Sequence, residues 1–155
     1  MSEYMEQPST IRRFLSSSPG DQARLSAATV LLIMISIGFV VGSFSRIRRY
    51  LLWSCDTISS VVPGSPTPAR VVSAVDVADR LIPGERTCLM RSLTAEALLR
   101  LYAFTPEHRI GVAKESGDDM KAHSWLELRG DVLIGDLEDL SQYKPLPSLE
   151  MGDQI

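Results

Sequence analysis

The sequence predicts an α+β domain in which helices come first and a short antiparallel sheet follows. Up to about residue 105, apolar residues recur at helical spacing. From His108 to Gly135, short alternating runs are separated by turn residues, as in paired strands. With 155 residues and 45% hydrophobic content, the chain is large enough for one packed domain.

Composition excludes several classes of function. The net charge of −3 argues against a nucleic-acid partner, which would require an excess of Lys and Arg. Cys55 and Cys88 are too few for a disulfide scaffold. Together with His108 and His123, they lack the close paired spacing of a zinc site. We therefore expect neither a metal nor another cofactor.

The N-terminal part divides into two segments. Residues 1–20 are polar and form a flexible lead-in, whereas residues 21–60 form a hydrophobic helical segment with no charge from Ala27 to Phe44. That apolar stretch is at the lower length limit for spanning a bilayer, so membrane contact through residues 27–44 and a docking or core helix both stay open. The arginines directly after it would place the remaining chain in the cytoplasm if it does span.

Two further helices are predicted before the sheet. Thr67 caps a helix that Pro68 opens, and the folded domain is expected to cover residues 68–155. Thr87 caps the next helix, which begins at Cys88 and runs to about Ala103. Its buried stripe is formed by Leu89, Leu93, Ala97 and Leu101.

The residue types at three positions suggest a thiol nucleophile, its base and the group that orients the base. Cys88 lies at a helix N-terminus, where the helix dipole stabilises a thiolate and unpaired N–H groups can bind an oxyanion. The alternative is that Cys88 is a small buried hydrophobe. Cys55 has no comparable setting and is interpreted as structural.

The expected strand register places His123 and Asp136 opposite each other. If Arg129-Gly130 is the centre of a hairpin, Leu126 faces Leu133, Trp125 faces Ile134 and His123 faces Asp136. Opposed side chains on one face have Cβ atoms about 4.5–5.5 Å apart, so a carboxylate could hold the imidazole. The alternative is an ordinary strand histidine and a turn aspartate.

Other polar residues near these positions are left outside the predicted site. His108 stands at a loop-to-strand boundary and is expected to be solvated. Arg91, Ser92 and Glu127 could shape the pocket, but a helix-surface Arg or an exposed strand Glu usually has no special role, so these residues are left out of the catalytic set.

Four short stretches together resemble a known family. They are Cys88-Leu89-x-Arg91-Ser92-Leu93, Ile110-Gly111-Val112, Ala122-His123-Ser124-Trp125-Leu126-Glu127 and Gly135-Asp136. The combination resembles the transglutaminase-like cysteine peptidases that remove leader peptides in lasso-peptide biosynthesis, of the microcin-processing type. This resemblance implies a transglutaminase-like or papain-like core, preceded by a hydrophobic helix. It also implies a catalytic triad of Cys88, His123 and Asp136.

A catalytic thiol suits a reducing compartment, so the protein is expected in the cytoplasm, with membrane association left open. The resemblance further implies an endopeptidase with defined partners. These are the precursor's leader peptide, a separate leader-binding recognition protein and a lasso cyclase. Two alternatives stay open at this point. One is a transglutaminase-like acyl transferase that uses the same three residues, and the other is a non-catalytic, membrane-associated scaffold.

Overall fold

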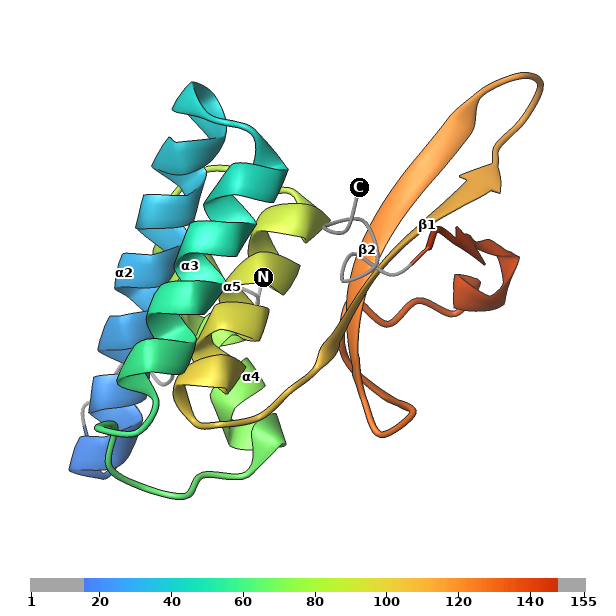
Figure 1. The fold of residues 1–155 in the computed structure, drawn as a ribbon. Helices are drawn as coiled ribbons and strands as arrows, with labels where there is room; N and C mark the ends of the chain where they lie inside the picture. The colour runs from blue at the N-terminus through green and yellow to red at the C-terminus, as the bar shows by residue number, and fades with distance from the viewer. Residues whose placement is uncertain (1–15, 148–155) are drawn as a thin grey trace, which may run out of the picture.

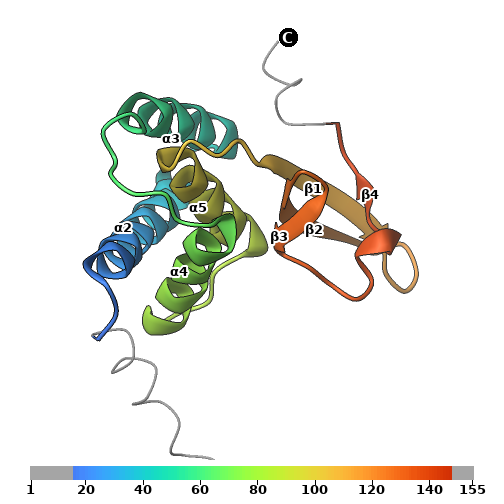
Figure 2. The ribbon, with the colours of Figure 1, turned by 90° about the horizontal axis from the view of Figure 1, so that it is seen from below.

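The computed structural model describes residues 16–147, in which four helices precede a four-stranded sheet. The helices are α2 (Pro19–Val41), α3 (Phe44–Ile58), α4 (Pro68–Leu81) and α5 (Cys88–Leu101). The strands are β1 (Glu107–Lys114), β2 (Met120–Leu128), β3 (Asp131–Ile134) and β4 (Lys144–Pro145), with the short helix η1 (Leu140–Gln142) before β4. The helices stand side by side next to the sheet (Figures 1 and 2). The predicted α+β class is confirmed.

The helix starts follow the capping signals in the sequence. Thr67 and Thr87 each cap a helix with the side-chain oxygen, which accepts from Arg70 N at 3.4 Å and from Met90 N at 3.3 Å. Ser18 caps α2, and Pro19 opens it. The predicted lead-in of residues 1–20 lies mostly outside the described residues. The start of α5 at Cys88 confirms the predicted helix N-terminus.

All four helices and the sheet share one hydrophobic core. The core includes Ala28, Leu31 and Leu32 of α2, Leu52 and Cys55 of α3, Val71, Val72, Ala74, Val75 and Ala78 of α4, Ala95, Ala97, Leu98 and Leu99 of α5, and Leu126 and Ile134 of the sheet. The segment 21–60, which the sequence pattern separates from residues 68–155, therefore contributes to the same core. Among the described residues before Pro68, there is no separate hydrophobic core.

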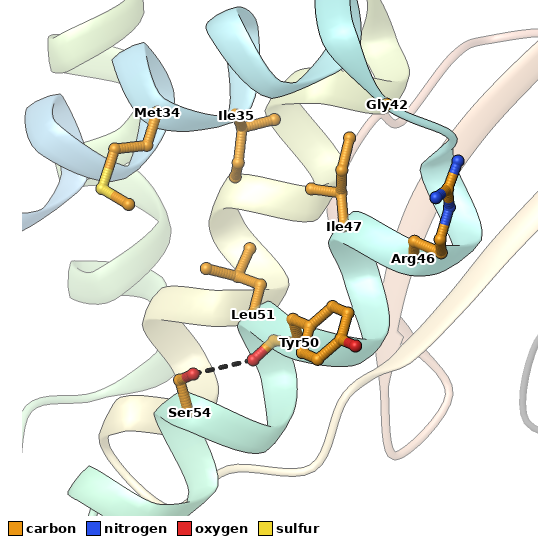
Figure 3. A pocket seen from close by; sticks show the side chains of 8 residues that line it. All are labelled: Met34, Ile35, Gly42, Arg46, Ile47, Tyr50, Leu51 and Ser54. Atoms are coloured by element: carbon orange, nitrogen blue, oxygen red, sulfur yellow. Dashed lines mark hydrogen bonds between the residues drawn. The ribbon is translucent and has the colours of Figure 1, made fainter.

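Helix α2 has two apolar faces with different surroundings. Its inner face is buried, whereas Val30, Ile33, Met34, Ile37, Val40 and Val41 are exposed. A groove of about 500 Å³ runs between this helix and α3, lined by Met34, Ile35, Gly42, Arg46, Ile47, Tyr50, Leu51 and Ser54 (Figure 3). Helix α2 is long and apolar enough to cross a membrane, but its buried inner face also makes it a core helix.

Removing residues 1–45 is expected to unfold the protein. The deletion takes Ala28, Leu32 and Ile35, each at most 1% exposed, out of the core. Each buried Leu or Ile contributes about 2 kcal/mol, against a total stability of about 5–15 kcal/mol. Circular dichroism during heating measures the effect, with Ile37→Ser as the control on the exposed face. Cooperative unfolding of the truncated protein would contradict the shared core.

The sheet has the order β3-β2-β1-β4, and every neighbouring pair is antiparallel. Strands β1 and β2 pair along their whole length, from Glu107 opposite Glu127 to Lys114 opposite Met120. Strand β3 covers only the end of β2, after a two-residue turn in which Arg129 and Gly130 have φ values of 55° and 89°. Positive φ at both positions is typical of a type I′ hairpin turn, so the predicted hairpin centre is confirmed.

Candidate active site

Cys88 is the first residue of α5 and is partly exposed. The N–H groups in the first turn of a helix have no acceptor within the helix. The Thr87 side chain satisfies that of Met90. The remaining N–H groups and the helix dipole favour a negative charge beside Cys88. This is the environment in which a thiol becomes a nucleophile.

One side of α5 connects the nucleophile's helix to β2. Cys88, Ser92 and Glu96 follow one another at four-residue spacing, which places them along one side of the helix. The Ser92 hydroxyl donates to the main-chain oxygen of Ser124 at 3.2 Å, and Ser92 is 1% exposed. Ser124 is the neighbour of His123 in β2. The helix turn that follows Cys88 therefore lies directly against the segment of β2 that carries His123.

The imidazole of His123 is held in one tautomer. Its Nε2 lies 2.7 Å from the main-chain oxygen of Gly135. A carbonyl oxygen only accepts hydrogen bonds, so Nε2 must carry the hydrogen. In the neutral ring, Nδ1 then has the lone pair that a general base needs. The ring also stacks on Trp125, with centroids 6.2 Å apart and planes 16° apart, and lies 5.5 Å from the Tyr143 ring.

Two glycines permit this close packing. A Cβ at Gly111 would lie 2.8 Å from the Trp125 ring. Gly135 has φ +82°, and a Cβ there would lie 2.6 Å from Ser124 O. These are contacts that a larger residue could not make without displacement. Gly135 can therefore approach β2 closely enough for its carbonyl to reach His123.

The predicted strand register holds for Leu128 and Glu127 and is wrong from Leu126 onward. Leu126 pairs with Ile134 rather than Leu133, because a β-bulge lies between the pairs of Leu126 and Glu127. One extra residue in β3 shifts every later position by one. In the structure, the His123 ring is bonded to the main chain of Gly135, the residue before Asp136. Among residues 16–147, the Asp136 carboxylate has no hydrogen-bond or ion-pair partner, so its role as the orienting group stays a prediction.

A buried polar network lies beneath this site and was missed in the sequence. Glu96 Oε2 is 2.7 Å from His108 Nδ1, and His108 Nε2 is 2.7 Å from Ser124 Oγ. Arg48 of α3 completes the network by donating to both Glu96 oxygens, at 3.2 and 2.7 Å. His108 is 4% exposed, so the prediction that it is solvated is wrong. The signal in the sequence is an acid, Glu96, within the apolar middle of a helix, since such a group needs a buried partner.

The same network holds Glu96 ionised. Burial raises the pKa of the Glu96 carboxyl, but hydrogen bonds from His108 and Arg48 outweigh that effect, and its pKa falls below the usual 4.5. A carboxyl with a lowered pKa stabilises the fold above its unfolded pKa. That contribution is lost as the pH falls through the lowered folded value.

Two other residues near the site have structural partners. Arg91 pairs with Asp76 at 2.8 Å and with Asp79 at 3.2 Å, which joins α5 to α4. Glu127 accepts from the indole N–H of Trp125 at 2.7 Å. Glu127 thereby helps to hold the ring on which His123 stacks.

The two cysteines differ in their environments. Cys55 is 4% exposed, and burial, followed by the neighbouring Asp56, raises the pKa of its thiol to about 11. Near neutral pH this thiol is protonated and inaccessible, and both properties make it unreactive. The prediction that Cys55 is structural agrees with this burial.

Iodoacetamide is therefore expected to alkylate Cys88 at least about tenfold faster than Cys55 in the folded protein near neutral pH. Cys88 is partly exposed at a helix N-terminus, whereas Cys55 is buried as a neutral thiol. Mass spectrometry of peptides after timed quenching measures the two rates. In denaturant the rates should converge, and equal rates in the folded protein would contradict the assignment.

Within residues 16–147, no group of three or more His, Cys, Asp or Glu side chains is placed to hold a metal ion. The thiol of Cys88 and the imidazole of His123 are groups that support nucleophilic and acid–base chemistry.

Comparison with known proteins gives one match. Residues 29–148 match the model of a family described as Transglut_core3, transglutaminase-like superfamily. The match includes α3, α4 and α5, most of α2 and all four strands. Neither the curated proteins nor the solved structures give a match.

Proposed function

Because this chain belongs to the transglutaminase-like superfamily, which includes cysteine peptidases and acyltransferases, we propose that it is a cysteine endopeptidase. Its substrate in this proposal is a ribosomally made lasso-peptide precursor, from which it removes the leader peptide. The observation that carries the proposal is the Ser92–Ser124 hydrogen bond. It places the helix turn that follows Cys88 against the segment of β2 that carries His123, so the two residues lie in one region of the fold.

In the proposed reaction, His123 Nδ1 takes the proton from the Cys88 thiol, and the sulfur attacks the carbonyl carbon of the scissile bond. The N–H groups at the start of α5 bind the oxyanion of the tetrahedral intermediate. His123 then gives its proton to the leaving amine, and the C–N bond breaks. Water, deprotonated by His123, hydrolyses the thioester and regenerates Cys88.

Asp136 is proposed as the acidic member of the triad. It directly follows Gly135, whose carbonyl holds His123 Nε2, so its carboxylate is carried by the residue next to the group that orients the ring. An anionic acceptor stabilises the imidazolium more than a carbonyl does.

Asp136→Asn is accordingly expected to keep the fold and to slow cleavage by about 10²–10⁴-fold, by analogy with other triad aspartates. Turnover of a precursor peptide, followed by mass spectrometry, gives the rate. Asp131→Asn and Asp139→Asn serve as controls and should change the rate little. A near-normal rate for Asp136→Asn would mean that the Gly135 carbonyl alone orients His123.

The decisive experiment incubates a candidate precursor with this protein, with and without its leader-binding protein. Hydrolysis adds water to the released fragment, whereas acyl transfer adds an amine, so product mass separates the two reactions. The buried rings of Trp125 and Tyr143 beside His123 favour acyl transfer as the second candidate, because they limit the access of water to the thioester. A hydrolysed product that forms faster with the leader-binding protein supports the peptidase.

We also propose that the enzyme is cytoplasmic and receives its substrate from a separate leader-binding protein, with a lasso cyclase acting on the product. The groove between α2 and α3 supports docking of another apolar surface there, because its lining is largely apolar and open (Figure 3). Membrane contact through residues 27–44 is the alternative use of the same face. Flotation with lipid vesicles tests it, and Ile37→Ser should abolish any binding that depends on that face.

A further inference from the structure

Strand β2 has one edge that β3 covers only in part. Strand β3 pairs with Leu126, Glu127 and Leu128 and ends at Ile134, where Gly135 turns the chain away. The first half of β2, from Met120 to His123, pairs with β1 on its other side. In the part of the chain that the structure describes, no strand pairs with this first half on the β3 side.

The hydrogen bonds at the two ends of β2 show to which side each residue directs its main-chain N–H and C=O groups. In a strand, successive residues direct their N–H and C=O groups to opposite edges. Leu128 flanks the two-residue turn opposite Asp131, and in such a hairpin this pair bonds across to β3. At the other end, Asp119 O accepts from Glu115 N at 2.9 Å, on the β1 side. The even-numbered residues of β2 therefore direct their main-chain groups to the β3 side.

Ser124 is an independent check on this direction. Its main-chain oxygen accepts from the Ser92 hydroxyl of α5, which lies outside the β1–β2 pair. Ala122 and Met120 are two and four residues before Ser124, so their N–H and C=O groups point to the same side. Met120 is 60% exposed, and Lys121 and Ala122 are also exposed. A row of main-chain donors and acceptors is thus accessible at this edge.

The open edge leads to the candidate active site. It begins at Met120, passes Ala122 and reaches Ser124, where Ser92 of α5 makes its contact. Cys88 lies one helical turn from Ser92, and His123 lies between Ala122 and Ser124. A chain bonded along this edge would therefore be directed toward Cys88 and His123.

We propose that the substrate binds as an added strand on the open edge of β2, bonded to the main-chain groups of Ala122 and Met120. The proposal rests on the peptidase function and defines its substrate class: an extended, unstructured peptide whose paired residues have main-chain N–H groups. Strand addition obtains affinity from main-chain hydrogen bonds, so it tolerates many side chains. It also delivers the scissile bond in the extended form that a thiolate can attack.

Proline substitution tests the edge directly. Ala122→Pro removes an N–H that points to the open edge, and proline is tolerated in strands at such positions. The fold should survive, as measured by thermal unfolding. Lys121→Pro is the matched control, because the Lys121 N–H points toward β1 and its loss should lower the melting temperature clearly. Ala122→Ser keeps the N–H and should keep binding.

The binding measurement uses three reagents that share one reactive group. They are iodoacetamide, tetra-alanine amide with an N-terminal iodoacetyl group, and acetyl-tetra-alanine with an iodoacetamidoethyl group at its C-terminus. The two peptides present the reactive group from opposite chain directions. We expect at least one to alkylate Cys88 about tenfold faster than iodoacetamide, since each main-chain hydrogen bond gained contributes up to that factor. In Ala122→Pro, this ratio should fall toward one.

The possible outcomes distinguish a failure of the strand-addition proposal from a failure of the peptidase proposal. If Cys88 reacts with iodoacetamide no faster than Cys55, the peptidase proposal fails. If Cys88 is reactive but neither peptide exceeds iodoacetamide, strand addition is wrong while the peptidase can stand. A ratio that is unchanged in Ala122→Pro also overturns strand addition. N-methylation of the alanines in the faster peptide should abolish its advantage, and an unaffected N-methylated peptide would contradict the proposal without any change to the protein.

Discussion

Replacing Cys88 with Ala is expected to abolish precursor cleavage, with at least a ~10³-fold loss of rate. The change removes the sulfur that would form the thioester, and a base without its nucleophile supplies little catalysis. Because Cys88 is partly exposed at the first position of α5, its loss leaves almost no cavity, and Thr87 still caps the helix. Mass spectrometry of the precursor over time measures the rate, and the thermal transition should shift little.

The control for this variant is Cys55→Ala. Cys55 is buried in the helical core, so this substitution should reduce stability slightly and leave the rate of cleavage nearly unchanged. A comparable loss of activity in both variants would mean that the choice between the two cysteines is wrong. Near-normal turnover by Cys88→Ala would end the thiol peptidase proposal.

Replacing Glu96 with Ala is expected to give the largest loss of stability of any substitution considered, about 3–5 kcal/mol. Glu96 is fully buried and bonds to both Arg48 and His108, so its removal leaves a buried guanidinium without its counter-charge. Unfolding in urea at neutral pH measures the difference. The difference between wild type and variant should shrink as the pH falls below 4.5, because Glu96 then takes up a proton in the unfolded chain while it stays ionised in the folded one, and the contribution is gone once the pH is below the lowered folded pKa.

Glu107→Ala is the matched control at an exposed acid. The Glu107 side chain is 62% exposed and pairs with Arg109 at the surface, so its loss should cost less than about 1 kcal/mol. Equal effects of the two substitutions would contradict the role of the buried network. Restoration of stability by replacing Arg48, Glu96 and His108 together with apolar residues would identify the unpaired charge as the cause of the loss.

Local signals in the sequence predicted most of the fold. Threonine caps at Thr67 and Thr87 fixed the starts of α4 and α5, since a side-chain oxygen there satisfies an N–H group that the helix cannot. Arg129-Gly130 predicted the hairpin centre because it interrupts two strand-like runs and glycine adopts positive φ readily. These features depend on neighbouring residues alone and are therefore readable from one sequence.

Features that depend on distant parts of the chain were not readable in the same way. Alternating polarity does not distinguish the bulged register of β3 from a regular one. The contacts of His108 with Glu96 and Ser124 connect residues from three elements. A sequence pattern assigns each residue separately to the surface or the core. A polar residue such as His108, however, can be buried only because its partners are buried with it.

The two faces of α2 also determine how the solubility of this protein can be improved. An apolar helix with an exposed face is often deleted to improve expression. In α2, however, the exposed apolar residues and the core residues lie on the same helical turns. Deletion would exchange an aggregation-prone surface for an exposed interior, which is a worse source of aggregation. Solubility must therefore be gained by polar substitution at outward positions such as Ile37, Val40 and Val41, with Ala28, Leu32 and Ile35 left unchanged.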